Sequence, residues 1–93
     1  MENKRSSYET IFVNQIPEPN EMEEGVLYAS RKYNYTLHKC MCGCGQVVCI
    51  PLDKGQWQWC STGNISFVRS IANVQQDCKS HYFLKNGKVI WYQ

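Results

Sequence analysis

The sequence predicts a small, mostly β protein, at most a small α+β fold, with a compact antiparallel sheet and a C-terminal β-hairpin. Three observations support this prediction. Short runs rich in β-branched and aromatic residues recur between clusters of turn-forming residues. No window carries a 3.6-residue apolar stripe for more than one or two turns. Near the C-terminus, Asn86-Gly87 is a dipeptide favoured in type I′ hairpin turns, because both positions require a positive φ.

Most of the chain is expected to alternate strands with loops. Residues 1–9 are polar and are expected to form a tail, which leaves residues 10–93 as a single domain. Pro17 and Pro19 interrupt any regular ladder, so the acidic stretch after them is expected to be a loop with one helical turn that ends at Gly25. Short β-branched or aromatic runs predict strands at residues 10–13, 26–30, 33–37, 46–50, 57–59 and 65–68.

Two further elements are expected towards the C-terminus. The Ser70 hydroxyl can accept a hydrogen bond from an unpaired backbone N–H, which predicts a cap on one helical turn over residues 71–76. Strands at residues 82–85 and 88–92 flank the Asn86-Gly87 turn. Aromatic residues that alternate along strands usually form a buried face, and this interpretation is applied to Trp57, Trp59, Tyr82, Trp91 and Tyr92.

Composition narrows the class of protein. The chain has 93 residues, enough for one small domain whose core alone leaves a thin margin of stability. A net charge of +2 is too small to indicate a nucleic-acid or membrane partner. The sequence shows no secretory signal and no apolar run of roughly 18–20 residues. We therefore expect a cytoplasmic protein whose six cysteines are metal ligands or thiols rather than disulfides.

The cysteines indicate a metal site. Three of them alternate within residues 40–45, and the glycines between them allow the backbone to turn so that the sulfurs converge. A fourth cysteine, Cys78, is separated from His81 by two residues, a spacing that a tight turn can close on one ion. Thiolates favour zinc over magnesium or calcium. We therefore predict that residues 10–93 form one zinc-binding domain with four thiolate ligands, Cys40, Cys42, Cys44 and Cys78.

The two histidines leave alternatives open. His38 and His81 either complete the metal site or stand next to it. Spacing alone favours His81 as the fourth ligand of a closed site, which has no open position for catalysis. If His81 is off the metal, it is a candidate general acid or base, with Ser80 and His38 as further catalytic candidates. A cysteine left off the metal is a candidate nucleophile. Cys49 and Cys60 are interpreted as buried small apolar residues or as redox-reactive thiols, in either case without a metal.

The order of motifs resembles a family of small bacterial and phage proteins long catalogued as a domain of unknown function. The resemblance rests on a His-x-Cys-x-Cys-Gly-Cys-Gly stretch at residues 38–45, a Ser-Ile-x-Asn stretch at 70–73, and Cys-x-Ser-His-Tyr at 78–82 followed by Gly-x-Val-x-Trp at 87–91. It covers nearly the whole chain. The positions that match are His38, Cys40, Cys42, Cys44, Ser70, Asn73, Cys78, Ser80 and His81.

This resemblance implies a function. Members of the family are often encoded beside bacterial ubiquitin-like proteins and their E1- and E2-like enzymes, and are implicated as peptidases that trim or release the ubiquitin-like protein. The resemblance therefore implies a zinc-dependent or zinc-supported peptidase that acts near the C-terminal tail of a ubiquitin-like partner. The alternative is a non-catalytic module, stapled by zinc, that binds a protein through exposed strands and aromatic residues.

Overall fold

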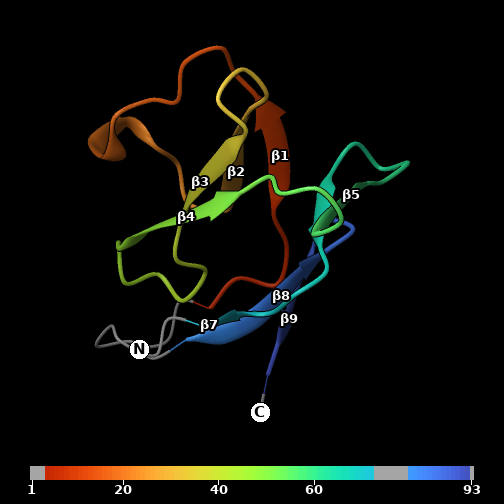
Figure 1. Ribbon diagram of the computed structural model, residues 1–93. Helices are drawn as coiled ribbons and strands as arrows, with labels where there is room; N and C mark the ends of the chain where they lie inside the picture. The colour runs from red at the N-terminus through yellow and green to blue at the C-terminus, as the bar shows by residue number, and fades with distance from the viewer. Residues whose placement is uncertain (1–3, 73–79, 93) are drawn as a thin grey trace.

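The computed structural model describes residues 4–72 and 80–92 (Figure 1). This part of the chain is mostly β, as predicted, and its one helix, the 3-10 turn η1, has three residues and is far too short to span a membrane. The elements are β1 (Glu9–Phe12), η1 (Pro19–Glu21), β2 (Val26–Ser30), β3 (Tyr35–Lys39), β4 (Val47–Pro51), β5 (Trp57–Trp59), β6 (Ile65–Phe67), β7 (Ile71–Ala72), β8 (His81–Lys85) and β9 (Lys88–Trp91).

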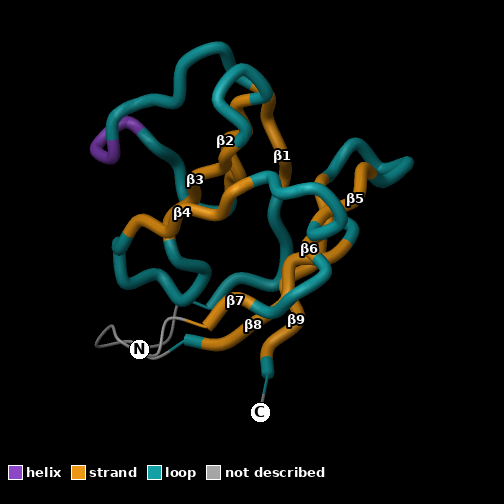
Figure 2. The backbone as a smooth tube through the Cα atoms, viewed as in Figure 1, coloured by secondary structure: helices purple, strands orange, loops and turns teal. Residues whose placement is uncertain are grey.

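The strands form three small sheets. The first has the order β1-β2-β3-β4, the second is the β5-β6 hairpin, and the third has the order β7-β8-β9. Figure 2 shows the first and third sheets on opposite sides of the molecule, joined by long loops. All pairs are antiparallel except β1 and β2, which are parallel. The parallel pair is possible because the proline-containing segment with η1 returns the chain to the start of the sheet.

The N-terminal segment connects the first sheet to the third. The Tyr8 N–H donates to the Gly87 carbonyl at 3.0 Å, and the Val89 N–H donates to the Ser6 carbonyl at the same distance. One residue later the chain enters β1, where Glu9 lies opposite Val26 of β2. Within the stretch expected to be a tail, the Tyr8 side chain is 5% exposed and packs in the core. Residues before β1 therefore contribute hydrogen bonds and apolar contacts to the fold.

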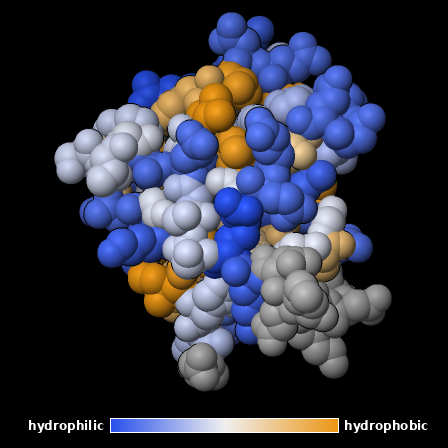
Figure 3. Space-filling view, turned by 180° about the vertical axis from the view of Figure 1, so that it is seen from behind, coloured by the Kyte–Doolittle hydropathy of each residue, from blue (hydrophilic) through white to orange (hydrophobic). Residues whose placement is uncertain are grey.

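The core lies between the sheets. Every residue of β2 is buried, and β8 alternates buried Tyr82 and Leu84 with half-buried neighbours, as a strand with one core face requires. Tyr82 was expected in the core and is fully buried, and Trp57 and Trp91 pack against the core. The same expectation was wrong for Trp59 and Tyr92, whose side chains are 51% and 63% exposed. Figure 3 shows that apolar residues reach the surface in separate patches among polar ones.

The C-terminal hairpin has the predicted geometry. Asn86 and Gly87 have φ values of 52° and 84°, so both turn positions lie in the left-handed region that a type I′ turn requires. β8 and β9 pair from Tyr82 opposite Trp91 to Lys85 opposite Lys88. Local turn chemistry was sufficient to predict this element.

The helical turn expected after Ser70 is wrong where the structure describes it. Ile71 and Ala72 form β7, and Ile71 lies opposite Tyr82 of β8. Ile71 is buried, so pairing with an available edge of β8 and burial of an apolar side chain outweigh the local capping preference. Residues 73–76 of the expected turn lie outside the described residues.

Candidate active site and metal loop

The three clustered cysteines lie in the loop between β3 and β4. The Cys40 N–H donates to the Gln46 carbonyl at 2.8 Å and closes this loop, and the Gly43 N–H donates to the Cys40 carbonyl at 3.0 Å. Gly43 and Gly45 have φ values of 89° and 88°, which residues with a Cβ rarely adopt. The glycines thus allow the tight loop, which we call the metal loop (residues 40–46).

The sulfur atoms of the metal loop converge. Those of Cys40, Cys42 and Cys44 all lie within 4.8 Å of one another, and the Cys40 and Cys42 sulfurs are 3.4 Å apart. Two thiolates on one tetrahedral zinc lie about 3.8 Å apart, given Zn–S bonds of about 2.3 Å. The three sulfurs are therefore spaced to bind one metal ion. Cys78, the fourth predicted ligand, lies outside the described residues.

His38 lies apart from this sulfur cluster. It is fully buried on β3, and its Nε2 is 2.8 Å from the Tyr82 hydroxyl, while Nδ1 has no hydrogen-bond partner among the described residues. Burial lowers the pKa of His38 to about 4, so the ring is neutral at pH 7. β3 ends at Lys39, so His38 lies on the strand, whereas the three cysteines lie in the loop after it.

A different pair of side chains has the geometry of a catalytic dyad. His81 Nε2 and Ser70 Oγ are 2.7 Å apart. His81 is the first residue of β8 and lies opposite Ala72, and Ser70 immediately precedes β7, so the β7–β8 register brings the two side chains together. The Ser70 hydroxyl can donate to Nε2 when the imidazole proton is on Nδ1. A serine hydrogen-bonded to a histidine base is the arrangement of an activated nucleophile.

Ser80 does not make this contact with its sequence neighbour. Its side chain is buried, whereas His81 is half-buried and contacts Ser70. Sequence reasoning therefore missed Ser70 as a catalytic candidate, although Ser70 did match the motif of the resembling family. The missing information was the cross-strand register, which no local pattern in residues 70–81 indicates.

Tyr92 and Tyr82 hold the strand that carries His81. The Tyr92 N–H donates to the His81 carbonyl at 2.9 Å, and the two rings stack with centroids 4.3 Å apart and planes 35° apart. On the core side, the Tyr82 hydroxyl contacts His38 and accepts a hydrogen bond from the Met41 N–H at 3.4 Å. Tyr82, the residue after His81, therefore connects the metal loop to β8.

A groove of about 550 Å³ lies beside Ser70. Its walls come from two strands, β4 and β7, and its remaining lining from the loops and strands between them. Cys49 lies in the β4 wall and is exposed, so the expectation that it is a buried apolar residue was wrong, while the alternative of a reactive thiol stays a prediction. Cys60 is half-buried, with its sulfur 2.9 Å from the Ser66 hydroxyl. The lining residues are Val48, Cys49, Ile50, Pro51, Asp53, Gln56, Phe67, Arg69, Ser70, Ile71 and Ala72.

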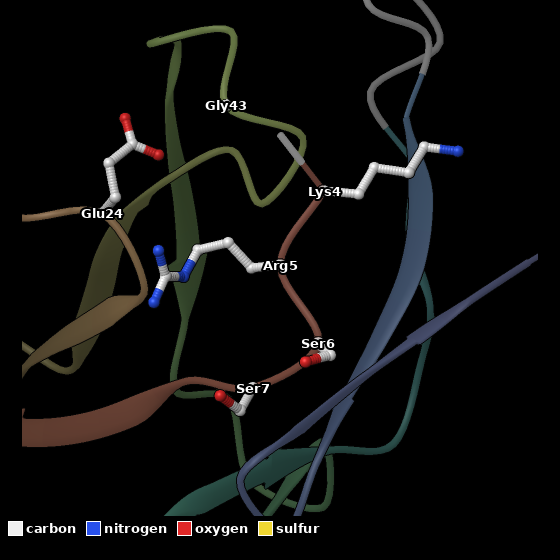
Figure 4. Close-up of a pocket in the computed structure, with 6 residues that line it drawn as sticks. All are labelled: Lys4, Arg5, Ser6, Ser7, Glu24 and Gly43. Carbon is white, nitrogen blue, oxygen red and sulfur yellow. The ribbon is translucent and has the colours of Figure 1, made fainter. Parts of the chain in front are cut away.

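A second hollow, of about 590 Å³, lies beside the metal loop and is lined by Lys4, Arg5, Ser6, Ser7, Glu24 and Gly43. Figure 4 shows the Arg5 side chain extending to the side of Glu24 and the Lys4 side chain extending the opposite way. The hollow is polar, but its lining includes no histidine or cysteine side chain. Of the two, only the groove beside Ser70 contains a nucleophile paired with a base.

Comparison with known proteins identifies one family. The sequence pattern of one family, described as bacterial ubiquitination-like system serine protease (BubE), matches residues 12–92. This range includes both Ser70 and His81 as well as all six cysteines. No curated protein and no solved structure matches the chain. The chain belongs to the BubE family of bacterial ubiquitination-like system serine proteases.

Proposed function

We propose that this protein is a serine peptidase that cleaves next to the C-terminal tail of a ubiquitin-like protein, in the cytoplasm. Ser70 is the nucleophile and His81 is the general base. The observation that carries the proposal is the 2.7 Å contact between Ser70 Oγ and His81 Nε2 at the edge of a groove. The serine protease description of the family supports the same assignment.

The proposed reaction has two steps. In the first, the Ser70 hydroxyl transfers its proton to His81 Nε2 while Oγ bonds to the scissile carbonyl carbon. The C–N bond then breaks, and the leaving amine takes the proton from His81, which leaves an ester on Ser70. In the second step, water gives a proton to His81 and attacks the ester, and Ser70 regains its proton as the carboxylic acid leaves.

The catalytic roles expected of Ser80 and His38 remain predictions. Both side chains are buried, at 6% and 0% exposure, whereas Ser70 lines the groove. Burial favours a supporting role for these two residues behind the site over contact with a substrate. Variants of both residues are therefore included in the test of the proposal.

We also propose that Cys40, Cys42, Cys44 and Cys78 bind one zinc ion. The spacing of the three described sulfurs and the thiolate donor set support zinc. A site with four protein ligands has no open position, so zinc there supplies structural energy rather than an activated water. In this chain the metal loop also contacts β8 through the Met41 N–H and Tyr82, which orients the strand that carries His81.

The test is a covalent reaction followed by a cleavage assay. A small fluorophosphonate, which reacts with activated serines, should label the protein once, with the adduct on Ser70 by tandem mass spectrometry. Ser70→Ala should abolish labelling and lower kcat/KM on a ubiquitin-like protein with a C-terminal extension by about a thousandfold or more. His81→Ala should lower both as well, since it removes the base.

Three further variants distinguish Ser70 from the other candidate catalytic residues. Ser61→Ala, in an exposed turn, is the matched control and should behave as wild type. Ser80→Ala and His38→Ala test the predictions from sequence, and an adduct on Ser80 would overturn the assignment of Ser70. A wild-type protein that neither labels nor cleaves would contradict the enzymatic proposal.

That last outcome would favour a non-catalytic interaction module. One observation supports this second candidate: Phe12 and Trp59 are exposed yet stack with centroids 5.1 Å apart, and the Arg31 guanidinium lies 5.1 Å from the centre of the Phe12 ring. Exposed aromatic residues beside an arginine are enriched at protein interfaces. Phe12→Ala would then weaken binding of the ubiquitin-like partner, measured by calorimetry, without any role for Ser70.

A further inference from the structure

We propose that the substrate tail binds in an extended conformation as an added β-strand on the exposed edge of β4, with the Cys49 backbone at the centre of the pairing. This inference rests on the proposed function, since it places the substrate of Ser70. In this proposal the tail is bound by hydrogen bonds to the backbone of β4 rather than by pockets for its side chains. Such strand addition is a common mode of peptide recognition.

In β4, the backbone N–H and C=O groups of every second residue point away from the neighbouring strand, β3. β4 is an edge of its sheet in the described residues, because it pairs only with β3 there. The hydrogen bonds Cys40 N–H to Gln46 carbonyl and Leu52 N–H to Asn34 carbonyl bracket the β3–β4 ladder. In an antiparallel ladder, hydrogen-bonded pairs alternate with pairs that share no hydrogen bond. The backbone N–H and C=O groups of Val48 and Ile50 are therefore the ones that bond to β3.

Consequently, Cys49 directs its backbone N–H and C=O towards the groove, away from β3. It lies opposite Leu37 at a non-hydrogen-bonded position of the ladder. Pro51, two residues later, has the same orientation but no N–H, so it marks the end of the edge that can both donate and accept. Within the groove, Cys49 is therefore the residue that can exchange two hydrogen bonds with an added strand.

β7 approaches the same groove from the other side. The Tyr92 N–H donates to the His81 carbonyl, so the backbone N–H and C=O groups of His81 point towards β9. The same groups of the next residue, Tyr82, therefore point towards β7. Ile71, opposite Tyr82, therefore pairs with β8, and the backbone groups of Ser70 point to the groove. There the Ser70 N–H can donate to the carbonyl oxygen that Oγ attacks.

The groove thus has a pairing edge on one wall and the nucleophile on the other. Four consecutive residues of β4, 48–51, and four consecutive residues around β7, 69–72, line it. Four extended residues span about 13 Å. An extended tail can pair with the β4 edge along this length, whereas a helix uses its backbone groups internally and leaves the β4 edge unpaired. The substrate class is therefore an unfolded, extended peptide segment.

The decisive variant removes one N–H donor. Cys49→Pro lacks the outward N–H, and proline is tolerated on an edge strand when the missing N–H does not face the sheet. Cys49→Ala is the matched comparison, since it loses the same thiol and keeps the N–H. Relative to Cys49→Ala, we expect Cys49→Pro to lower kcat/KM on a quenched fluorescent octapeptide about tenfold, the effect of one lost hydrogen bond.

Fluorophosphonate labelling separates the two proposals. The reagent is too small to need the β4 edge, so Cys49→Pro should label at Ser70 as fast as Cys49→Ala. Failure of the wild-type protein to label would reject the proposed function itself. Equal kcat/KM for Cys49→Pro and Cys49→Ala, with normal labelling, would overturn only the strand-addition proposal.

A measurement on the wild-type protein covers the case in which Cys49→Pro does not fold. N-methylation of one substrate amide at a time blocks strand pairing but keeps every side chain. In an added strand, the backbone N–H of every second residue points towards β4. Methylation at every second position should therefore lower kcat/KM about tenfold. No effect at any position would overturn the proposal, as would an equal effect at all positions.

Discussion

His81, the proposed general base, has three contacts, one with Ser70 and two with Tyr92. Ser70 contacts its Nε2, the Tyr92 amide fixes its backbone, and the Tyr92 ring covers its imidazole. Tyr92 is otherwise mostly exposed, so core packing does not account for its position. In the proposed mechanism His81 becomes positively charged, and the Tyr92 ring then makes a cation–π contact with it.

This contact leads to a first prediction. Tyr92→Ala keeps the backbone hydrogen bond but removes the ring, and should lower kcat about two- to fivefold, given roughly 0.5–1 kcal/mol for an exposed cation–π contact. Tyr92→Phe keeps the ring and should retain wild-type activity. Identical kcat values for all three proteins would show that the ring does not position or stabilise His81.

A second prediction at the residue scale concerns Tyr82. Tyr82→Phe leaves His38 Nε2 without its buried partner, and an unsatisfied buried group costs about 1–3 kcal/mol. The free energy of unfolding, measured in urea, should fall by that amount. Tyr28→Phe is the matched control, because its hydroxyl accepts one hydrogen bond from Glu23 in a less buried setting. A smaller loss for Tyr82→Phe than for Tyr28→Phe would contradict the importance assigned to the His38 contact.

Among the elements, the β8–β9 hairpin turn depends on two separate properties of glycine. Gly87 has a φ of 84°, and a Cβ there would lie 2.9 Å from the Asn64 side chain. Asn64 in turn accepts a hydrogen bond from the Thr10 N–H of β1. The turn therefore contacts a residue that helps to hold β1 in place.

The third prediction separates these two properties. Gly55 has the same φ of 84°, but a Cβ added there would meet no atom within 4 Å, so Gly55→Ala should cost only the backbone penalty of about 1–2 kcal/mol. Gly87→Ala should cost more, because the Asn64 side chain must move as well. Thermal unfolding of both variants measures the difference. Equal losses would mean that Asn64 moves without cost to β1.

The metal loop gives a fourth prediction, also at the scale of an element. If the sulfurs hold zinc, the purified protein should contain one zinc per chain, and a chelator should lower its melting temperature by many degrees, since metal binding is coupled to folding in small domains. Cys42→Ser should lose the metal and reproduce the chelator effect. Cys49→Ser, outside the loop, should keep the zinc and the melting temperature. Full stability of Cys42→Ser would argue against a structural metal.

At the scale of the whole molecule, Tyr8 joins elements from both ends of the chain. Its hydroxyl donates to the Ile65 carbonyl, and its amide donates to Gly87. Burial raises the pKa of Tyr8 above its usual value of 10, and the nearby Cys60 thiolate raises it further. The unfolded chain therefore releases this proton at a lower pH than the folded protein does.

The fifth prediction follows from the sign of that difference. Because the unfolded state binds fewer protons above pH 10, the free energy of unfolding falls as the pH rises through this range. In Tyr8→Phe this contribution is absent. The stability advantage of wild type over Tyr8→Phe should therefore shrink between pH 8 and pH 11, as measured by urea unfolding at each pH. An advantage that stays constant over this range would mean that Tyr8 ionises equally in both states.

Much of the fold could be predicted from the sequence, because its signals are local. Short apolar and aromatic runs predicted β2 at residues 26–30 and β5 at 57–59 with the bounds that the structure has. The positive φ of Asn86 and Gly87 is a property of that dipeptide in a type I′ turn. The convergence of the sulfurs in residues 40–44 follows from close spacing and glycine. Membership of the family, too, was indicated by motifs along the chain.

The position of Ser70, the proposed nucleophile, depended on tertiary structure. Ser70 and His81 are eleven residues apart, and only the β7–β8 register places their side chains within 2.7 Å. Register depends on which strands pair and which faces are buried, and these are properties of the assembled core rather than of a local segment. By itself, the sequence determined the class of fold, the cysteine cluster and the family. The tertiary structure decided which serine meets the histidine, and which strand edge faces it across the groove.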